Sequence, residues 1–345
     1  MLYRYSRRPA RTGRAFCPFF GQAPRIGFFA VAALFLGGVI ATAQSSQPAS
    51  ASETEGRFQR WYWYEPGLEH GNPVVNSRFR VNAPDVVAHP QWATRQEVRG
   101  NGMMQILMEE DLRWLTGAEL YLELWGGHPG SANKRVTPNG RTTYLLPKVG
   151  SEAENCAYYY PLVPLRVSDL VNGYNALQFA VDQGTTFWGH FIVDNACLRA
   201  ELTHRHPDLV RAGLADFRPT ANAAPATDGN EVIQISLSVP EASLSAVESV
   251  DFEGFFDGYD ENGDRQSRDW HGFTKQRRPV AILGTARQAP FAIAWDTTML
   301  PDQKEVGVRA LVHFKSQSKL MYLTPPTLGV RLPQRKGRVV RLFPA

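Results

Sequence analysis

Residues 170–202 read LVNGYNALQFAVDQGTTFWGHFIVDNACLRAEL, and this stretch decides the predicted fold class. Leu177, Phe179 and Val181 alternate with polar or small residues, which is the period of a half-buried β-strand. Gly184 ends that run, after which an aromatic loop, FWGH, leads into a second apolar run. The order of strand, aromatic loop and strand predicts a β-sandwich that carries an aromatic loop at its rim.

The composition supports an all-β chain. With 345 residues it has room for about two domains. It contains 29 glycines and 24 prolines, a density of chain breakers that suits short strands and turns. The formal net charge of +4 depends on residues 1–43, which hold six arginines and no acid. Without those six, 31 basic residues face 33 acidic ones, so the net charge is −2 and the composition predicts no nucleic-acid partner.

The first 43 residues have the features of a targeting segment. A long basic stretch precedes the apolar run at 26–43, which ends in the small residues Ala41-Thr42-Ala43. This pattern predicts a signal peptide cleaved after residue 43. The run is about 18 residues long, so an uncleaved membrane anchor stays open. We expect a secreted, periplasmic or cell-envelope protein, attached to a membrane only through 26–43. Residues 44–56 are predicted to be a disordered spacer.

Residues 57–203 are predicted to form a first β-sandwich module. Its clearest strand, ELYLELW, ends at Trp125, and Asn139-Gly140 is a strong hairpin signal. The ELYLELWGG strand and loop, the PNGR hairpin and the run LVNGYNALQF resemble galactose-binding-like jelly-roll modules. The resemblance implies a jelly roll, a fold that hosts sugar binders, adhesins and accessory domains of enzymes.

A second module is predicted at 230–345, after a linker at 204–229. Its apolar residues alternate in several short runs, the longest being VGVRALVHF. The run beginning APFAIAWDTTMLPD, followed by that strand, resembles the Ig-like modules of bacterial extracellular proteins. An insertion at 257–278 departs from their pattern. We therefore expect a jelly roll followed by an Ig-like sandwich, behind the N-terminal segment.

Four residues beside predicted strands of the first module are candidate ligand contacts. Trp125 and His128 lie in one loop region, and Trp188 and His190 lie in another. If the loops share a rim, they form an aromatic platform with two imidazoles, which suits the apolar faces and polar edges of a sugar. The alternative is that the tryptophans close the core.

The insertion contains a candidate calcium loop. Asp260, Asn262 and Asp264 alternate in the spacing with which an EF-hand loop begins to wrap Ca²⁺. Arg265 stands where that motif requires glycine, and His271 stands where it requires glutamate, so a full EF-hand is excluded. A smaller Ca²⁺ site and a solvated turn both remain open.

A disulfide is the expected state of the exported cysteines. Cys156 and Cys197 are the pair that remains once the targeting segment, with Cys17, is removed. Export would place them in an oxidising compartment, so we expect a Cys156–Cys197 bond. Two buried free thiols are the alternative.

The sequence does not identify a reaction. It contains no G-x-S-x-G, H-E-x-x-H, P-loop or dinucleotide-binding motif. The favoured hypothesis is a non-catalytic exported protein that binds carbohydrate at the cell envelope or outside the cell. An envelope-anchored structural or adhesion protein that binds another protein is the alternative. A hydrolase of polysaccharides is less favoured, because no two carboxylates are singled out as a pair.

Overall fold

The structure is a computed structural model of the whole chain. It describes residues 55–64, 79–83, 103–127, 131–146, 157–182, 190–224, 231–275, 278–315 and 317–333. Ala49–Ala345 form one compact unit. The predicted signal or anchor segment, 1–43, and most of the predicted spacer lie outside the described residues.

Strands predominate among the described elements, which confirms the predicted all-β fold. The first part of the chain forms β1 (Arg57–Trp63), β2 (Phe79–Asn82), β3 (Met103–Met108), β4 (Leu115–Trp125), β5 (Arg135–Pro138), β6 (Tyr144–Leu145), β7 (Tyr158–Tyr159), β8 (Leu162–Leu165), β9 (Gly173–Ala180) and β10 (His190–Leu202). The short helix α2 (Pro207–Arg211) follows. The remainder forms β11 (Thr220–Ala223), β12 (Val232–Ser238), β13 (Val247–Asp257), β14 (Arg268–Lys275), β15 (Arg278–Ala281), β16 (Gly284–Ala286), β17 (Ala292–Asp296), β18 (Val306–Phe314), β19 (Gln317–Leu323) and β20 (Thr327–Val330).

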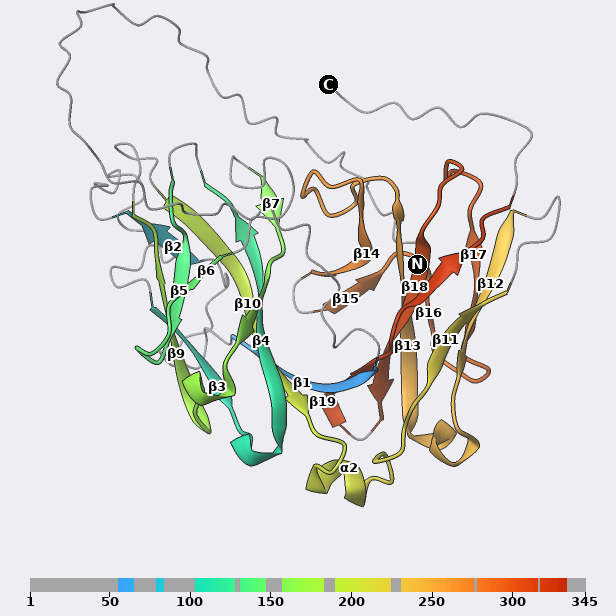
Figure 1. The fold of residues 1–345 in the computed structure, drawn as a ribbon, viewed down its shortest axis with the longest axis horizontal. Coiled ribbons are helices and arrows are strands. Elements are labelled where there is room, and N and C mark those ends of the chain that lie inside the picture. Colours follow the sequence, from blue (N-terminus) through green and yellow to red (C-terminus); the bar gives the residue numbers. More distant parts are fainter. Residues whose placement is uncertain are drawn as a thin grey trace, which may run out of the picture. The chain divides into compact units, whose positions relative to one another are not determined.

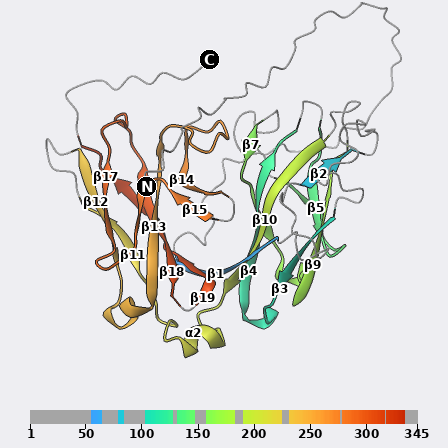
Figure 2. The same ribbon diagram turned by 180° about the vertical axis from the view of Figure 1, so that it is seen from behind.

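One long antiparallel sheet runs through both predicted modules (Figures 1 and 2). Its strand order is β15-β14-β13-β18-β19-β1-β10-β4-β7, and β2, β8, β16 and β20 add to it at the sides, giving 13 strands. A four-stranded sheet, β3-β9-β5-β6, and a three-stranded sheet, β11-β12-β17, complete the fold. We call the 13-stranded sheet the long sheet.

β1 joins the two halves of the long sheet. Phe58 pairs with Leu202 of β10 on one side and with Tyr322 of β19 on the other. Its ring is fully buried and lies 4.8 Å from the Tyr322 ring and 6.0 Å from the Phe217 ring, between centroids. Backbone hydrogen bonds and aromatic packing therefore connect the two halves at the same residue.

Each smaller sheet packs on one end of the long sheet. β3 contacts β1 and β10, while β11 contacts β18 and β20. The apolar side chains of alternate strand positions fill the space between the sheets, for example Leu120, Leu122 and Leu124 of β4, which are fully buried. The arrangement therefore resembles two β-sandwiches that share the long sheet as one of their layers.

The strands that the alternating pattern predicts are present. The patterns around 118–125, 177–181 and 306–314 correspond to β4, β9 and β18. Asn139 and Gly140 have φ angles of 50° and 67°, the positive values that a tight hairpin turn between β5 and β6 requires. Local periodicity was therefore sufficient where one face of a strand is buried.

The structure differs from the sequence-based expectation in three regions. Part of the predicted insertion is the strand β14, which pairs with β13, and β19 of the predicted second module pairs with β1 of the first. The predicted linker also contributes to the core, since Leu209, Phe217 and Ala221 are buried. These segments lack a regular apolar period because each buries only a few side chains.

Phe58→Ala tests the role of the junction. Removing a fully buried ring that packs on both halves leaves a cavity, and we expect a loss of about 3–5 kcal/mol of unfolding free energy. Urea unfolding measures the change. Met299→Ala is the matched control, because that side chain is 78% exposed. Equal stability of the two variants would contradict the role assigned to β1.

Candidate functional site

The face of the long sheet that points away from the two smaller sheets is rich in aromatic and charged residues. Alternation on β4 buries its leucines and directs Glu119, Tyr121, Glu123 and Trp125 to this outer face. The cross-strand partner of Tyr121 on β10 is Cys197, so neighbouring strands place their side chains on the same face. We call this surface the outer face.

The middle of the outer face is a small second core. Trp61, Tyr121, Cys197, Leu311 and Met321 form a buried cluster that includes residues of both halves. The aromatic side chains that β1 places on this face are therefore held by packing.

The structure does not support the predicted disulfide. Cys197 is a fully buried free thiol inside this cluster, and burial raises its pKa to about 12. Cys156 lies outside the described residues. The expectation of a Cys156–Cys197 bond rested on export and on the count of cysteines. Cys197 lies on the outer face of β10 and packs against side chains of the neighbouring strands β1 and β4, which matches the alternative of a buried thiol.

Arg199 is clamped between two aromatic rings in the same region. Its guanidinium carbon lies 4.2 Å from the centroid of Trp61 and 4.4 Å from that of Tyr121. Cation–π contacts of this kind stabilise by roughly 0.5–2 kcal/mol when they are desolvated. Glu119 lies 3.5 Å from Arg199 and also accepts a hydrogen bond of 3.1 Å from Gln59. These charges serve to hold the outer face together.

Contacts from the second half cover the centre of the outer face. The Tyr160 hydroxyl donates to the carbonyl of Asn262 at 2.9 Å, and its ring centroid lies 6.1 Å from that of Phe273. The Tyr121 hydroxyl reaches the carbonyl of Thr274 at 3.5 Å. Open binding surface on this face must therefore lie toward its two ends.

Two of the predicted rim residues, Trp125 and His190, lie at one of these ends. The rings of Trp125 and His190 are 5.4 Å apart between centroids, and Trp125 is half-buried while His190 is buried. His190 Nδ1 lies 2.9 Å from the guanidinium of Arg80. His128 and Trp188 lie outside the described residues. The structure thus brings together the two members of the predicted set that it describes.

The hydrogen bond from Arg80 fixes the tautomer of His190. A guanidinium can only donate, so Nδ1 must accept and the proton of the neutral ring resides on Nε2. Arg80 is held in turn by the side-chain oxygen of Asn82, which accepts from Nε at 3.0 Å. The imidazole is therefore oriented before any ligand arrives.

Gly127 allows the chain to leave β4 close to His190. It has a φ of +87°, and a Cβ at this position would lie 2.0 Å from the carbonyl oxygen of His190. Only glycine fits such an approach without displacing the backbone. The loop that carries His128 consequently begins directly beside β10.

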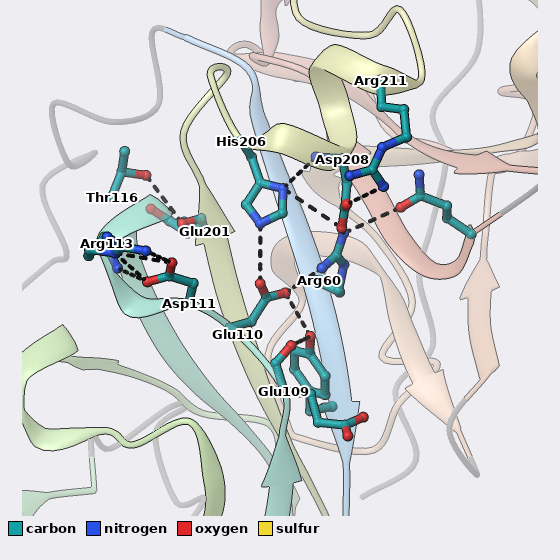
Figure 3. Close-up of polar contacts among 12 residues, drawn as sticks. Arg60, Glu109, Glu110, Asp111, Arg113, Thr116, Glu201, His206, Asp208 and Arg211 are labelled. Atoms are coloured by element: carbon teal, nitrogen blue, oxygen red, sulfur yellow. Dashed lines mark hydrogen bonds and ion pairs between the residues drawn. The ribbon is translucent and has the colours of Figure 1, made fainter.

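A buried polar network connects β1, α2 and the segment before β4 (Figure 3). The side chain of Glu110 is 1% exposed, and it accepts hydrogen bonds from Arg60 at 2.8 Å and from the Tyr62 hydroxyl at 2.6 Å. His206 Nε2 lies 3.4 Å from the same carboxylate. Arg60 also donates to Asp208 at 3.0 Å.

The network is a structural connection rather than a catalytic group. His206 Nδ1 accepts from the backbone N–H of Asp208 at 3.2 Å and so caps α2. Burial and the hydrogen bond to Glu110 raise the pKa of Tyr62, which keeps its hydroxyl protonated as a donor. Each polar group already has a partner in the chain, and the described pocket lies elsewhere.

The predicted calcium loop is held by its own backbone. Asp260 accepts from the N–H groups of Gly263, Asp264 and Arg265 at 2.8, 3.0 and 2.9 Å. Asn262 accepts from the N–H of Asp264 at 3.0 Å. The contacts are those of a turn built by Asp and Asn side chains, and calcium binding stays a prediction.

His271 anchors this loop to β13 and β14. Its Nδ1 lies 2.7 Å from a carboxylate oxygen of Glu261, and its Nε2 lies 2.8 Å from the carbonyl oxygen of Phe256. Because both neighbours only accept, both ring nitrogens must carry protons, so the geometry defines an imidazolium. Burial opposes the charge, but Glu261 and the nearby Asp269 outweigh it and raise the His271 pKa. Partial burial and other nearby carboxylates raise the pKa of Asp269 to about 7.

A second histidine cluster lacks the geometry of an activated nucleophile. Asp251 accepts from His313 Nε2 at 2.7 Å and from the Thr285 hydroxyl at 2.5 Å. The carboxylate therefore lies between the hydroxyl and the imidazole. A base that activates a nucleophile must itself contact the hydroxyl.

Comparisons with known proteins do not place the chain in a family: no protein-family model, curated protein or solved structure matches it. The helices in the described ranges include none with the length and apolarity needed to cross a membrane. Within those ranges, no group of three or more His, Cys, Asp or Glu side chains is placed to hold a metal ion. The resemblances to galactose-binding-like and Ig-like modules stay predictions, and function has to be argued from geometry.

Sequence reasoning missed several residues that organise the sites. Glu110 stood in a run of acidic residues with nothing to distinguish it, and its partners come from distant segments. Arg199 and Arg309 were equally inconspicuous. The alternation in ELYLELW was a usable signal, because it places Tyr121 and Trp125 together on one face.

Glu110→Ala should destabilise the fold. The substitution leaves Arg60 partly buried with Asp208 as its remaining charged partner, and breaking a buried ion pair in this way costs about 3 kcal/mol. Urea unfolding measures the change. Glu109→Ala is the matched control, since that side chain is exposed and its contact with Tyr62 uses the backbone carbonyl. A control variant as unstable as Glu110→Ala would rule out this explanation.

Asp269 and His271 make stability depend on pH. The folded-state pKa of Asp269, about 7, exceeds the unfolded value of about 4, so the stability of the wild type relative to Asp269→Asn should fall as pH rises between these values. The raised pKa of His271 acts in the same direction above about pH 6.5. Thermal unfolding of both proteins from pH 4 to 8 measures the difference. Asp302→Asn, which changes an exposed carboxylate, should follow the wild type; a constant difference for Asp269→Asn would contradict the assignment.

Proposed function

We propose that this chain is a non-catalytic exported protein that binds carbohydrate at the cell envelope or outside the cell. The observation that carries the proposal is the half-buried ring of Trp125 beside the oriented imidazole of His190, at the end of β4 and β10. Export is supported by the basic and apolar sequence at 1–43.

The neighbouring strand adds a second aromatic side chain. Tyr158 of β7 pairs with Trp125 in the antiparallel register, which places both side chains on the same face of the long sheet. Tyr158 is 38% exposed. An aromatic surface flanked by fixed polar groups suits a sugar ring, which has C–H faces and hydroxyl edges.

The chemistry of the described residues favours binding over catalysis. Arg80 and His190 are engaged with each other, and Gly127 brings the next loop close to them. These contacts restrain the side chains in advance, which reduces the entropy lost on binding. They supply hydrogen-bonding groups and an aromatic wall, but no pair of carboxylates across a shared cleft.

Trp125→Ala tests the proposed site. Loss of the ring removes the stacking surface, and we expect binding to the recognised glycan to weaken about tenfold or more. A glycan array followed by titration calorimetry measures this. Tyr174→Ala is the control, because Tyr174 is 56% exposed on β9 of the four-stranded sheet. Unchanged binding by Trp125→Ala, with folding intact, would show that this site is wrong.

A further inference from the structure

A pocket on the outer face, distinct from the Trp125 site, is lined by residues of β14, β18 and β19 and of the start of β1. It has a volume of about 30 Å³ and is lined by residues that include Arg57, Trp270, Arg309, Pro325 and Pro326. That volume corresponds to about one water molecule. The pocket can therefore admit one polar edge of a ligand, while the rest of the ligand stays outside.

Arg309 is fixed in place beside Trp270. Its Nε donates to Glu253 at 2.7 Å, and Glu253 is its cross-strand partner on β13. The guanidinium carbon lies 4.1 Å from the centroid of the Trp270 ring. The described residues offer no hydrogen-bond partner to its two terminal nitrogens. The donors are thus oriented in advance, and a ligand would lose little side-chain entropy by using them.

The other side of the pocket offers further donors. One terminal nitrogen of Arg57 is paired with Glu201, and the other lies 3.6 Å from a carboxylate oxygen of Glu119, while within the described part of the chain its Nε has no partner. The same holds for the indole N–H of Trp270, which is half-buried. These donors can be satisfied by a ligand that presents oxygen atoms as acceptors.

The charge balance selects among oxygen-rich ligands. Arg309 is already paired with Glu253, Arg57 is paired with Glu201 and Glu119, and the exposed carboxylate of Glu55 also lines the pocket. No net positive charge remains to favour an anion. Uncharged hydroxyl groups can accept hydrogen bonds from these donors without bringing a negative charge close to the carboxylates.

We propose that this pocket is a subsite for a neutral saccharide. One hydroxyl-bearing edge of a sugar enters between Arg57 and Arg309, and the C–H face of the ring lies against the apolar wall of Trp270, Pro325 and Pro326. The subsite deepens the proposed function, on which it rests for the class of ligand. It differs from the Trp125 site in being lined by residues of β14, β18 and β19 together with the start of β1.

Titration calorimetry of the full chain tests the subsite. The probes are cello-, xylo-, manno- and galacto-oligosaccharides, with oligogalacturonate as the charged comparison. Trp270→Ala and Arg309→Lys should each weaken binding of the preferred neutral oligosaccharide about tenfold or more. The first substitution removes an apolar surface that lines the pocket. The second removes the oriented guanidinium donors while keeping the positive charge. Tyr259→Ala, which changes a 68% exposed tyrosine, should bind as the wild type does.

The outcomes separate the two proposals. Wild-type affinity in both Trp270→Ala and Arg309→Lys, together with weakened binding by Trp125→Ala, would overturn the subsite and leave the proposed function in place. A preference for oligogalacturonate that Arg309→Lys abolishes would overturn the neutral class of ligand. Absence of binding by the wild type to every probe would overturn the proposed function and the subsite with it. Circular dichroism confirms that each variant is folded.

Discussion

The fold depends on the two-sided pairing of β1. This strand donates and accepts backbone hydrogen bonds with β10 on one edge and with β19 on the other, so it closes the gap between two groups of strands that are far apart in sequence. Phe58 adds an aromatic contact with Tyr322 at the same position. An edge left unpaired here would expose a row of backbone polar groups on each half.

The shared sheet also determines where binding surface can exist. Because side chains alternate between faces, each apolar residue directed into a sandwich places its neighbour on the outer face. Packing around Trp61 and Arg199 then closes the centre of that face. Aromatic and hydrogen-bonding groups remain toward the ends, near Trp125 on β4 and near Trp270 on β14. The proposed sites follow from the same constraint that holds the fold together.

Much of the fold could be predicted from local patterns. Where one face of a strand is buried, as in β9, the apolar period is regular and the strand is evident from sequence. The sequence RDWHGFTK of β14 alternates poorly because its neighbours cover parts of both faces, so it was assigned to a loop. Pairing partners could not be predicted, since β1 selects strands more than 130 residues away.

The candidate site was predictable only in part. Trp125 and His190 were identified from their places next to strands, and the structure brings them together. Neither the Glu110 network nor the Arg309 pocket leaves a local signal, because their residues come from three or more separate segments. Cys197 shows the limit of counting residues, since its state depends on what packs around it.

Hydrogen exchange across a urea series tests the central claim that β1 makes the two halves one cooperative unit. Mass spectrometry would follow peptides from β10 in the first half and from β18 in the second. Shared pairing through β1 predicts that both peptides lose protection at the same urea concentration. Loss of protection in one half while the other stays protected would contradict the account, because it would mean that β1 does not couple them.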